Sequence, residues 1–217
     1  MTADREILRA WLTARSIARG LPPPVPEFGG FLVDTDSEEE IRRWVFAEVV
    51  AGISELAGSI AEPLHLIKLC GTEAELRQAL PAAWTIQGGS WFMAFESEPP
   101  KVHPLPLGYA LQTIRDGPVT RVEIRAAEGE LAASGYGAET SHAFVYDRIA
   151  TDTAHRRKGL GRAVMAAIGS CRNSRSARQL LMATAEGEKL YSTLGWIRLS
   201  PYSTAYLPTN VPRSSAG

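Results

Sequence analysis

The most informative segment of the chain is the octapeptide HRRKGLGR, which runs from His155 to Arg162. Four of its residues are basic and none is acidic. Its two glycines, Gly159 and Gly161, let backbone N–H groups approach a ligand closely. The pattern places a strand before this segment and a helix after it, and a helix N-terminus favours an anion. The segment therefore predicts a binding site of pyrophosphate size, although a basic turn can also be merely solvated.

The spacing of these glycines excludes two common phosphate loops. The chain lacks Gly-x-x-x-x-Gly-Lys-Ser/Thr, so the segment is no Walker loop. A dinucleotide fingerprint would need a third glycine where Val164 stands.

Strand and helix patterns surround the basic loop in an α/β order. Alternating apolar residues and turn signals predict an antiparallel meander with strands at 109–114, 119–126, 131–138 and 143–151. After the loop we expect a helix at 159–171, a buried strand at 180–183, a short helix at 186–194, and strands at 196–199 and 204–207. This order predicts a mixed α/β sheet in the carboxyl half.

The amino-terminal half has its own α/β order. We expect a helix at 5–19, a strand at 31–33, a long helix capped at Ser37 and continuing to Ile60, a strand at 64–69, a short helix capped by Thr72 and Glu75, and a strand at 91–95. A proline-rich seam at 96–106 predicts two regions, 1–106 and 107–217. The sequence shows no internal repeat.

Composition narrows the classes of protein. The 217 residues carry 23 Lys+Arg and 24 Asp+Glu, which argues against nucleic-acid or membrane-surface binding. Two cysteines, Cys70 and Cys171, match no zinc spacing, so we expect no metal and a reducing compartment. With no signal peptide and no spanning segment, we predict a cytoplasmic monomer or homodimer. Arginine outnumbers lysine nineteen to four, a hint of a GC-rich bacterial gene.

Two motifs resemble those of the GNAT superfamily of N-acyltransferases. Arg156–Gly161 resembles its Arg/Gln-x-x-Gly-x-Gly/Ala acyl-CoA loop, and Leu190–Trp196 is similar to its Leu-Tyr-x-x-Leu-Gly-Phe segment. The likeness covers roughly residues 107–208. It implies a GNAT-like fold in the carboxyl half. It also implies acetyl-CoA as the donor and a primary amine as the acceptor. The amino-terminal half has its own strand-helix-strand-helix order, which fits a degenerate copy of the same fold or a lid. We expect it to pack on the carboxyl half because its tryptophans need to be buried, namely Trp11, Trp44 and Trp84.

The resemblance also implies roles for particular residues. Backbone groups of Ile149, Ala150 and Thr151 would bind the pantetheine arm and polarise the thioester carbonyl. The pyrophosphate would be held by the loop residues Arg156, Arg157, Lys158, Gly159, Leu160, Gly161 and Arg162. Tyr191 would protonate the departing CoA thiolate, unless it is simply an aromatic packed beneath a short helix. The chain departs from the family where Thr184 and Gly187 replace the common Asn and Ala, which removes one pantetheine contact.

Asp147 is our candidate for the base that deprotonates the amine. Strand alternation groups it with Ala143, Val145 and Ile149, and apolar neighbours would raise its pKa. Asp147 can instead form an Asp–Arg pair or be an ordinary hydrogen-bonded polar residue of the strand, and water is the alternative acceptor of the proton. Weaker candidates for the base are His142, Glu123 and Glu139.

These observations favour an N-acetyltransferase that works by direct attack in a ternary complex. Two other hypotheses stay open, namely a CoA-binding sensor or partner-binding module without turnover, and an acyltransferase with a longer acyl donor. Aminoglycosides, small amines, amino acids and peptide N-termini all stay open as acceptors, because a fold does not fix its substrate.

Overall fold

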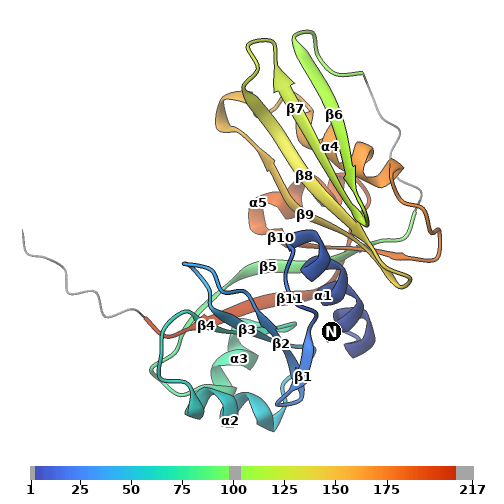
Figure 1. Ribbon diagram of the computed structural model, residues 1–217. Coiled ribbons are helices and arrows are strands. Elements are labelled where there is room, and N and C mark those ends of the chain that lie inside the picture. Colours follow the sequence, from blue (N-terminus) through green and yellow to red (C-terminus); the bar gives the residue numbers. More distant parts are fainter. Residues whose placement is uncertain (1–2, 98–103, 209–217) are drawn as a thin grey trace, which may run out of the picture.

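A computed structural model describes residues 3–97 and 104–208, and these residues form one mixed sheet with five α-helices around it (Figure 1). The eleven strands lie in the order β1-β2-β3-β4-β11-β5-β10-β9-β8-β7-β6. Their bounds are β1 Val25–Glu27, β2 Gly30–Asp34, β3 Arg42–Phe46, β4 His65–Leu69, β5 Thr85–Phe95, β6 Tyr109–Asp116, β7 Val119–Ala126, β8 Leu131–Glu139, β9 Ala143–Thr151, β10 Arg178–Thr184 and β11 Ile197–Tyr206. The helices are α1 Arg5–Arg19, α2 Ala51–Ser59, α3 Glu73–Ala79, α4 Leu160–Ser170 and α5 Ala185–Thr193.

The two halves of the chain repeat one topology. In each half a strand, a helix, a parallel strand, a helix and a final strand follow one another, as β3-α2-β4-α3-β5 and as β9-α4-β10-α5-β11. The final strands are exchanged, because β5 pairs with β10 and β11 pairs with β4. β5 and β11 also pair with each other at the centre. The sheet is therefore continuous across both halves.

Helices α1 and α4 cover opposite faces of the carboxyl-half strands. α1 begins at Asp4, whose carboxylate accepts the N–H groups of Glu6 and Ile7, and it ends at Gly20. The core beneath α1 contains Val145 and Leu180, whereas the core beneath α4 contains Phe144 and Leu181. Because neighbouring residues of a strand point to opposite faces, the sheet lies between these two cores.

The structure confirms most predicted elements and corrects two. Helix α1 has the predicted bounds, and Thr72 and Glu75 form the predicted capping box of α3. The long helix from Ser37 to Ile60 is wrong. Ser37 and Glu40 close a turn, then β3 pairs with β4, and only α2 is helical. The two predicted terminal strands are one strand, β11, with register shifts at Arg198/Ser200 and Tyr202/Thr204. Of the proline-rich seam, residues 98–103 lie outside the described residues.

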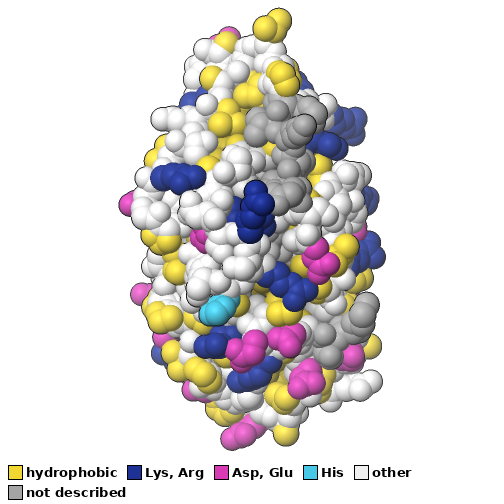
Figure 2. Space-filling model, turned by 90° about the vertical axis from the view of Figure 1, so that its right-hand side faces the viewer, with side chains coloured by type: hydrophobic (Ala, Val, Ile, Leu, Met, Phe, Trp, Pro, Cys, Tyr) yellow, Lys and Arg dark blue, Asp and Glu magenta, His cyan; other side chains and the backbone are white. Residues whose placement is uncertain are grey.

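Basic and acidic side chains are interspersed over the lower half of the face in Figure 2. Within the described part of the chain, no helix has the length and apolar character needed to cross a membrane.

Candidate functional site

The candidate site lies where β9 and β10 separate. Their parallel pairing runs from Ala143↔Arg178 to Tyr146↔Leu181 and stops there. Beyond that point β9 stays paired with β8, and β10 stays paired with β5. A cavity of about 750 Å³ opens at this point, lined by β9, β10, the start of α4, and parts of α1 and α5.

The start of α4 offers unused backbone donors to this cavity. Gly159 precedes the helix with φ 78° and ψ 3°, a left-handed conformation that glycine adopts at little cost. The first helical bond runs from the Ala163 N–H to the Gly159 carbonyl. The N–H groups of Leu160, Gly161 and Arg162 therefore lack partners within the helix and can bind an anion.

The basic side chains of the loop do different things. Arg156 forms an exposed ion pair with Glu186 at 3.1 Å. Lys158 turns away from the cavity and donates to the Tyr109 hydroxyl at 2.8 Å. Arg157 and Arg162 form no ion pair with any described residue, so both keep their charge free for a ligand. The cavity is lined by all the predicted donor-binding residues except Lys158, namely Ile149, Ala150, Thr151, Arg156, Arg157, Gly159, Leu160, Gly161 and Arg162.

A bulge in β9 changes the faces that strand alternation predicted. Arg148 has φ 51°, and the β8–β9 register shifts between Ser134 and Tyr136. Ile149 consequently packs against the core beneath α4, whereas Asp147 points to the α1 side, as Val145 does. The expectation that Asp147 and Ile149 share a face is wrong, because the extra residue reverses the alternation.

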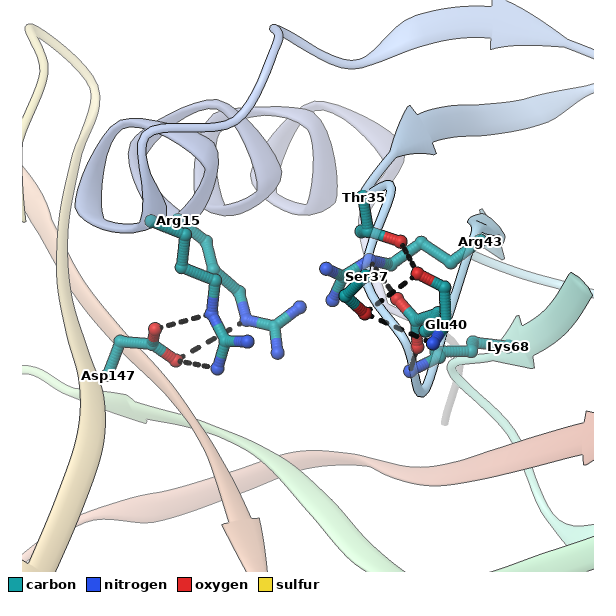
Figure 3. A network of polar contacts seen from close by, with 8 residues as sticks. Arg15, Thr35, Ser37, Glu40, Arg43, Lys68 and Asp147 are labelled. Carbon is teal, nitrogen blue, oxygen red and sulfur yellow. Dashed lines mark hydrogen bonds and ion pairs between the residues drawn. The ribbon is translucent and has the colours of Figure 1, made fainter. Parts of the chain in front are cut away.

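Asp147 is held by arginines from α1 (Figure 3). Arg19 donates from Nε to Oδ2 at 2.6 Å and from Nη2 to Oδ1 at 2.9 Å. The Nε atoms of Arg15 and Arg148 each lie 3.5 Å from its carboxylate. Burial by itself would raise the pKa of Asp147, but the hydrogen bonds from Arg19 and the nearby arginine charges outweigh it and hold the pKa below its ordinary value. The expected raised pKa is wrong, and the geometry matches the alternative of an Asp–Arg pair.

Tyr191 lies on the wall of the same cavity. The residue is buried, with its ring centroid 6.2 Å from that of Trp196, and its hydroxyl makes no hydrogen bond to a described residue. Burial, and secondly the charge of Asp147, raise the pKa of Tyr191 to about 12. The phenol therefore stays protonated at neutral pH, and its proton is available to a ligand in the cavity.

Solved structures share this fold at low sequence identity. A GCN5-related N-acetyltransferase from Kribbella flavida is 15% identical, with 91% of this chain and 94% of that chain covered and a TM-score of 0.65. A putative acetyltransferase of the GNAT family from Novosphingobium aromaticivorans is 16% identical, with 94% and 96% covered and a TM-score of 0.55. A tandem GNAT protein from the clavulanic acid biosynthesis pathway is 14% identical, with 82% and 78% covered and a TM-score of 0.56. The chain has the GNAT fold. No protein-family model matches the sequence, and no curated protein matches it.

The amino-terminal half of this GNAT-fold chain has no equivalent of the basic loop. Its β3–α2 connection, residues 47–50, contains one charged residue, the acidic Glu48. The first turn of α2 is also closed by protein, because a Cβ on Gly52 would lie 1.9 Å from the carbonyl oxygen of Phe28. Of the two helix N-termini at equivalent positions in the topology, that of α4 opens into the cavity, whereas that of α2 packs against Phe28.

The departures from the GNAT pattern have a local explanation at α5. Thr184 caps this helix, and its hydroxyl accepts the Gly187 N–H at 3.2 Å. A side chain at Gly187 would place its Cβ 3.1 Å from Cε2 of Tyr191, so glycine leaves room beside the phenol ring.

The three weaker candidates for the base, His142, Glu123 and Glu139, are not among the residues that line the cavity. His142 is exposed at a bend, Glu123 is paired with Arg121 and Arg125, and Glu139 accepts hydrogen bonds from Asn173 and Ser174. The described residues also contain no cluster of three or more His, Cys, Asp or Glu side chains suited to a metal.

Sequence reasoning missed Arg15 and Arg19, which line the cavity from α1. The available signal was their spacing of four residues, which places them on one side of a helix. Nothing in the sequence connected that side with a strand some 130 residues later.

Proposed function

We propose that the protein is an N-acetyltransferase that moves an acetyl group from acetyl-CoA to a primary amine by direct attack in a ternary complex. One observation carries the proposal. A single cavity, at a gap in a GNAT-fold sheet, joins the unused amides of α4 to the unbonded hydroxyl of Tyr191. The likeness to solved GNAT acetyltransferases supports the reaction type.

The residues present fit the donor. The N–H groups from Leu160 to Arg162, together with Arg156, Arg157 and the Lys158 backbone, would hold the pyrophosphate. Beyond Tyr146, the edge of β9 that faces β10 has no partner strand. Its backbone groups at Ile149, Ala150 and Thr151 would form hydrogen bonds with the amides of the pantetheine arm. A backbone N–H at the bulge would stabilise negative charge on the thioester oxygen.

The proposed acetyl transfer needs one group that accepts a proton from the amine and one that donates a proton to the thiolate. The amine nitrogen forms a bond to the acetyl carbon, the carbon–sulfur bond breaks, and the nitrogen loses one proton. We propose that water takes this proton, because both oxygens of Asp147 are engaged and its lowered pKa makes it a weak base. Asp147 stays the alternative proton acceptor. Tyr191 gives its proton to the CoA thiolate and regains one from solvent.

Calorimetry and thiol release test this function. Acetyl-CoA should bind at micromolar concentration, and an amine should trigger release of free thiol. Tyr191→Phe should lower kcat by about 10²-fold while leaving acetyl-CoA affinity nearly intact. Tyr206→Phe, on β11, is the matched control and should keep full turnover. No heat at high micromolar acetyl-CoA would overturn the proposal, and an unchanged kcat would remove Tyr191 from the mechanism.

A CoA-binding module without turnover is the second candidate. It is favoured by Thr184, whose hydroxyl caps α5 where many family members have an asparagine. Acetyl-CoA binding without thiol release over a broad amine panel would support it. Thermal shifts with acetyl-CoA, longer acyl-CoAs and free CoA would show whether a longer donor fits better.

We also propose that residues 107–217 bind the donor and that residues 1–106 are a degenerate copy of the same unit. The repeated order of strands and helices supports this, as does the closed N-terminus of α2. A tandem GNAT protein among the similar structures shows that two such units can share a chain.

A further inference from the structure

The α1 side of the cavity carries an excess of positive charge. Three arginines line it, namely Arg15 and Arg19 from α1 and Arg148 from the bulge of β9. Among the described residues that line this side, one carboxylate, Asp147, faces them. The loop at Arg156 to Arg162 lies on the α4 side, so these three arginines are separate from the proposed pyrophosphate site.

Arg15 is the most buried of the three arginines and is only weakly paired. Its contact with Asp147 is long, at 3.5 Å through Nε, and its Nη atoms bond to no described residue. Figure 3 shows its guanidinium extending past Asp147 toward Arg43. Burial, then repulsion from Arg43 and Arg19, lowers the pKa of Arg15 to about 10.

The neighbouring charges do not neutralise Arg15. Arg43 is 4% exposed and shares the single carboxylate of Glu40 with Lys68. The Nε atom of Arg43 lies 2.8 Å from Glu40 but is not aligned for a hydrogen bond, so it is buried without a partner. The cations Arg15, Arg19, Arg43 and Lys68 outnumber the carboxylates of Asp147 and Glu40 that pair with them, so a bound anion would lower the cost of burying this charge.

Arg148 contributes the third guanidinium group of the α1 side, from the bulge of β9. Its guanidinium lies 3.7 Å from the ring centroid of Tyr136 and donates from Nη2 to the carbonyl of Ala18. These contacts fix the side chain beside the bulge, on the cavity that also contains Tyr191.

We propose that the acceptor is an anionic amine, whose carboxylate or phosphate is bound by Arg15 and Arg148 while its amino group reaches the gap between β9 and β10. This inference rests on the proposed transferase function and specifies its acceptor. Guanidinium groups recognise both anions with paired N–H donors.

Matched pairs of amines test the proposal by turnover. The members of each pair differ in the anionic group, as in β-alanine against β-alaninamide, L-phenylalanine against its amide, and O-phosphoethanolamine against ethanolamine. Because losing the anion also makes the amine less basic, rates are compared per concentration of unprotonated amine. Thiol release with acetyl-CoA should favour the anionic member by about tenfold or more in kcat/KM for at least one pair. Comparing the two carboxylate pairs with the phosphate pair shows which anion the site prefers. Equal rates with the neutral partners would overturn this inference and leave the transferase function standing.

Binding of the acetylated products gives a readout that needs no turnover. N-acetyl-β-alanine and N-acetyl-β-alaninamide, with the acetyl derivatives of the other pairs, are titrated into the full chain with free CoA present. The anionic product should bind about tenfold more tightly. If no amine is acetylated, the transferase function fails, whereas equal affinity of charged and neutral products overturns the anion site itself.

Substitutions in α1 test whether the preference for the anionic amine depends on Arg15. Arg15→Gln should abolish the preference for the anionic member, and Arg15→Lys should restore part of it. Arg9→Gln is the matched control, because Arg9 lies on the exposed side of the same helix and pairs with Glu6. Arg148→Gln, at a more exposed side chain, repeats the test in case Arg15→Gln does not fold. An unchanged preference in both the Arg15→Gln and Arg148→Gln variants, with acetyl-CoA still bound, would refute the proposal.

Discussion

Replacing Asp147 with Asn keeps the shape of the side chain and removes the charge that Arg15, Arg19 and Arg148 contact. Breaking a buried ion pair by removing one partner costs about 3–5 kcal/mol. Here the Arg19 side chain is 28% exposed, and the amide oxygen of Asn still accepts one hydrogen bond. We therefore expect the free energy of unfolding to fall by about 2 kcal/mol, which lowers Tm by about 4–8 °C for a chain of this length.

The sign of the pH dependence follows from the pKa of Asp147. Its folded-state pKa is lowered below 3.8, so its contribution to stability is present above that value and is lost as pH falls through the folded pKa. Urea unfolding at about pH 7 should separate the wild type from Asp147→Asn, and the difference should shrink below about pH 4.

A control and a kinetic readout distinguish an ion pair from a base. Asp34→Asn removes an exposed pair with Arg42, in which both side chains are about half exposed, and should change stability by less than about 1 kcal/mol. If Asp147 were the general base, its variant would lose the acid limb of the kcat profile while keeping its stability. That result, or a stability loss no larger than that of Asp34→Asn, would refute the ion-pair argument.

Two glycine variants test whether acetyl-CoA binds at the basic loop and not at the equivalent helix of the amino-terminal half. Gly159→Ala, at φ 78° with open space around the new Cβ, should cost about 1–2 kcal/mol through backbone strain and weaken acetyl-CoA binding several-fold by calorimetry. Gly52→Ala forces a Cβ against the Phe28 carbonyl and should lower stability by about 1–3 kcal/mol in urea, with acetyl-CoA affinity unchanged in the folded fraction. The reverse pattern, with binding lost at Gly52 and kept at Gly159, would contradict the placement of the donor site.

Elements whose evidence is local could be predicted from the sequence. The helix that follows the basic loop, α4, could be predicted, because its glycine start and its apolar spacing are read from neighbouring residues. The capping box of Thr72 and Glu75 and the meander of β6 to β9 are equally local. Their success reflects short-range hydrogen bonding and a strict period of two.

Elements that depend on distant partners could not be predicted in the same way. Trp44 and Val45 fit an amphipathic helix, but β4 gives them a parallel partner and so makes β3 a strand. The bulge at Arg148 leaves no sequence signal, and it alone reverses the face of Ile149. The sequence places Asp147 among apolar neighbours, because two of the arginines that lower its pKa, Arg15 and Arg19, come from α1, which is distant along the chain.

The exchanged strands explain why the site needs both halves of the chain. Separation near residue 106 would take β11 from β4 and β5 from β10, so each fragment would expose a strand edge now buried in the sheet. The same separation would remove α1, and with it Arg15 and Arg19, from a cavity whose donor loop belongs to the other half. The basic loop, proposed to bind the donor, belongs to the carboxyl half, whereas the charge proposed to select the acceptor comes largely from the amino-terminal helix.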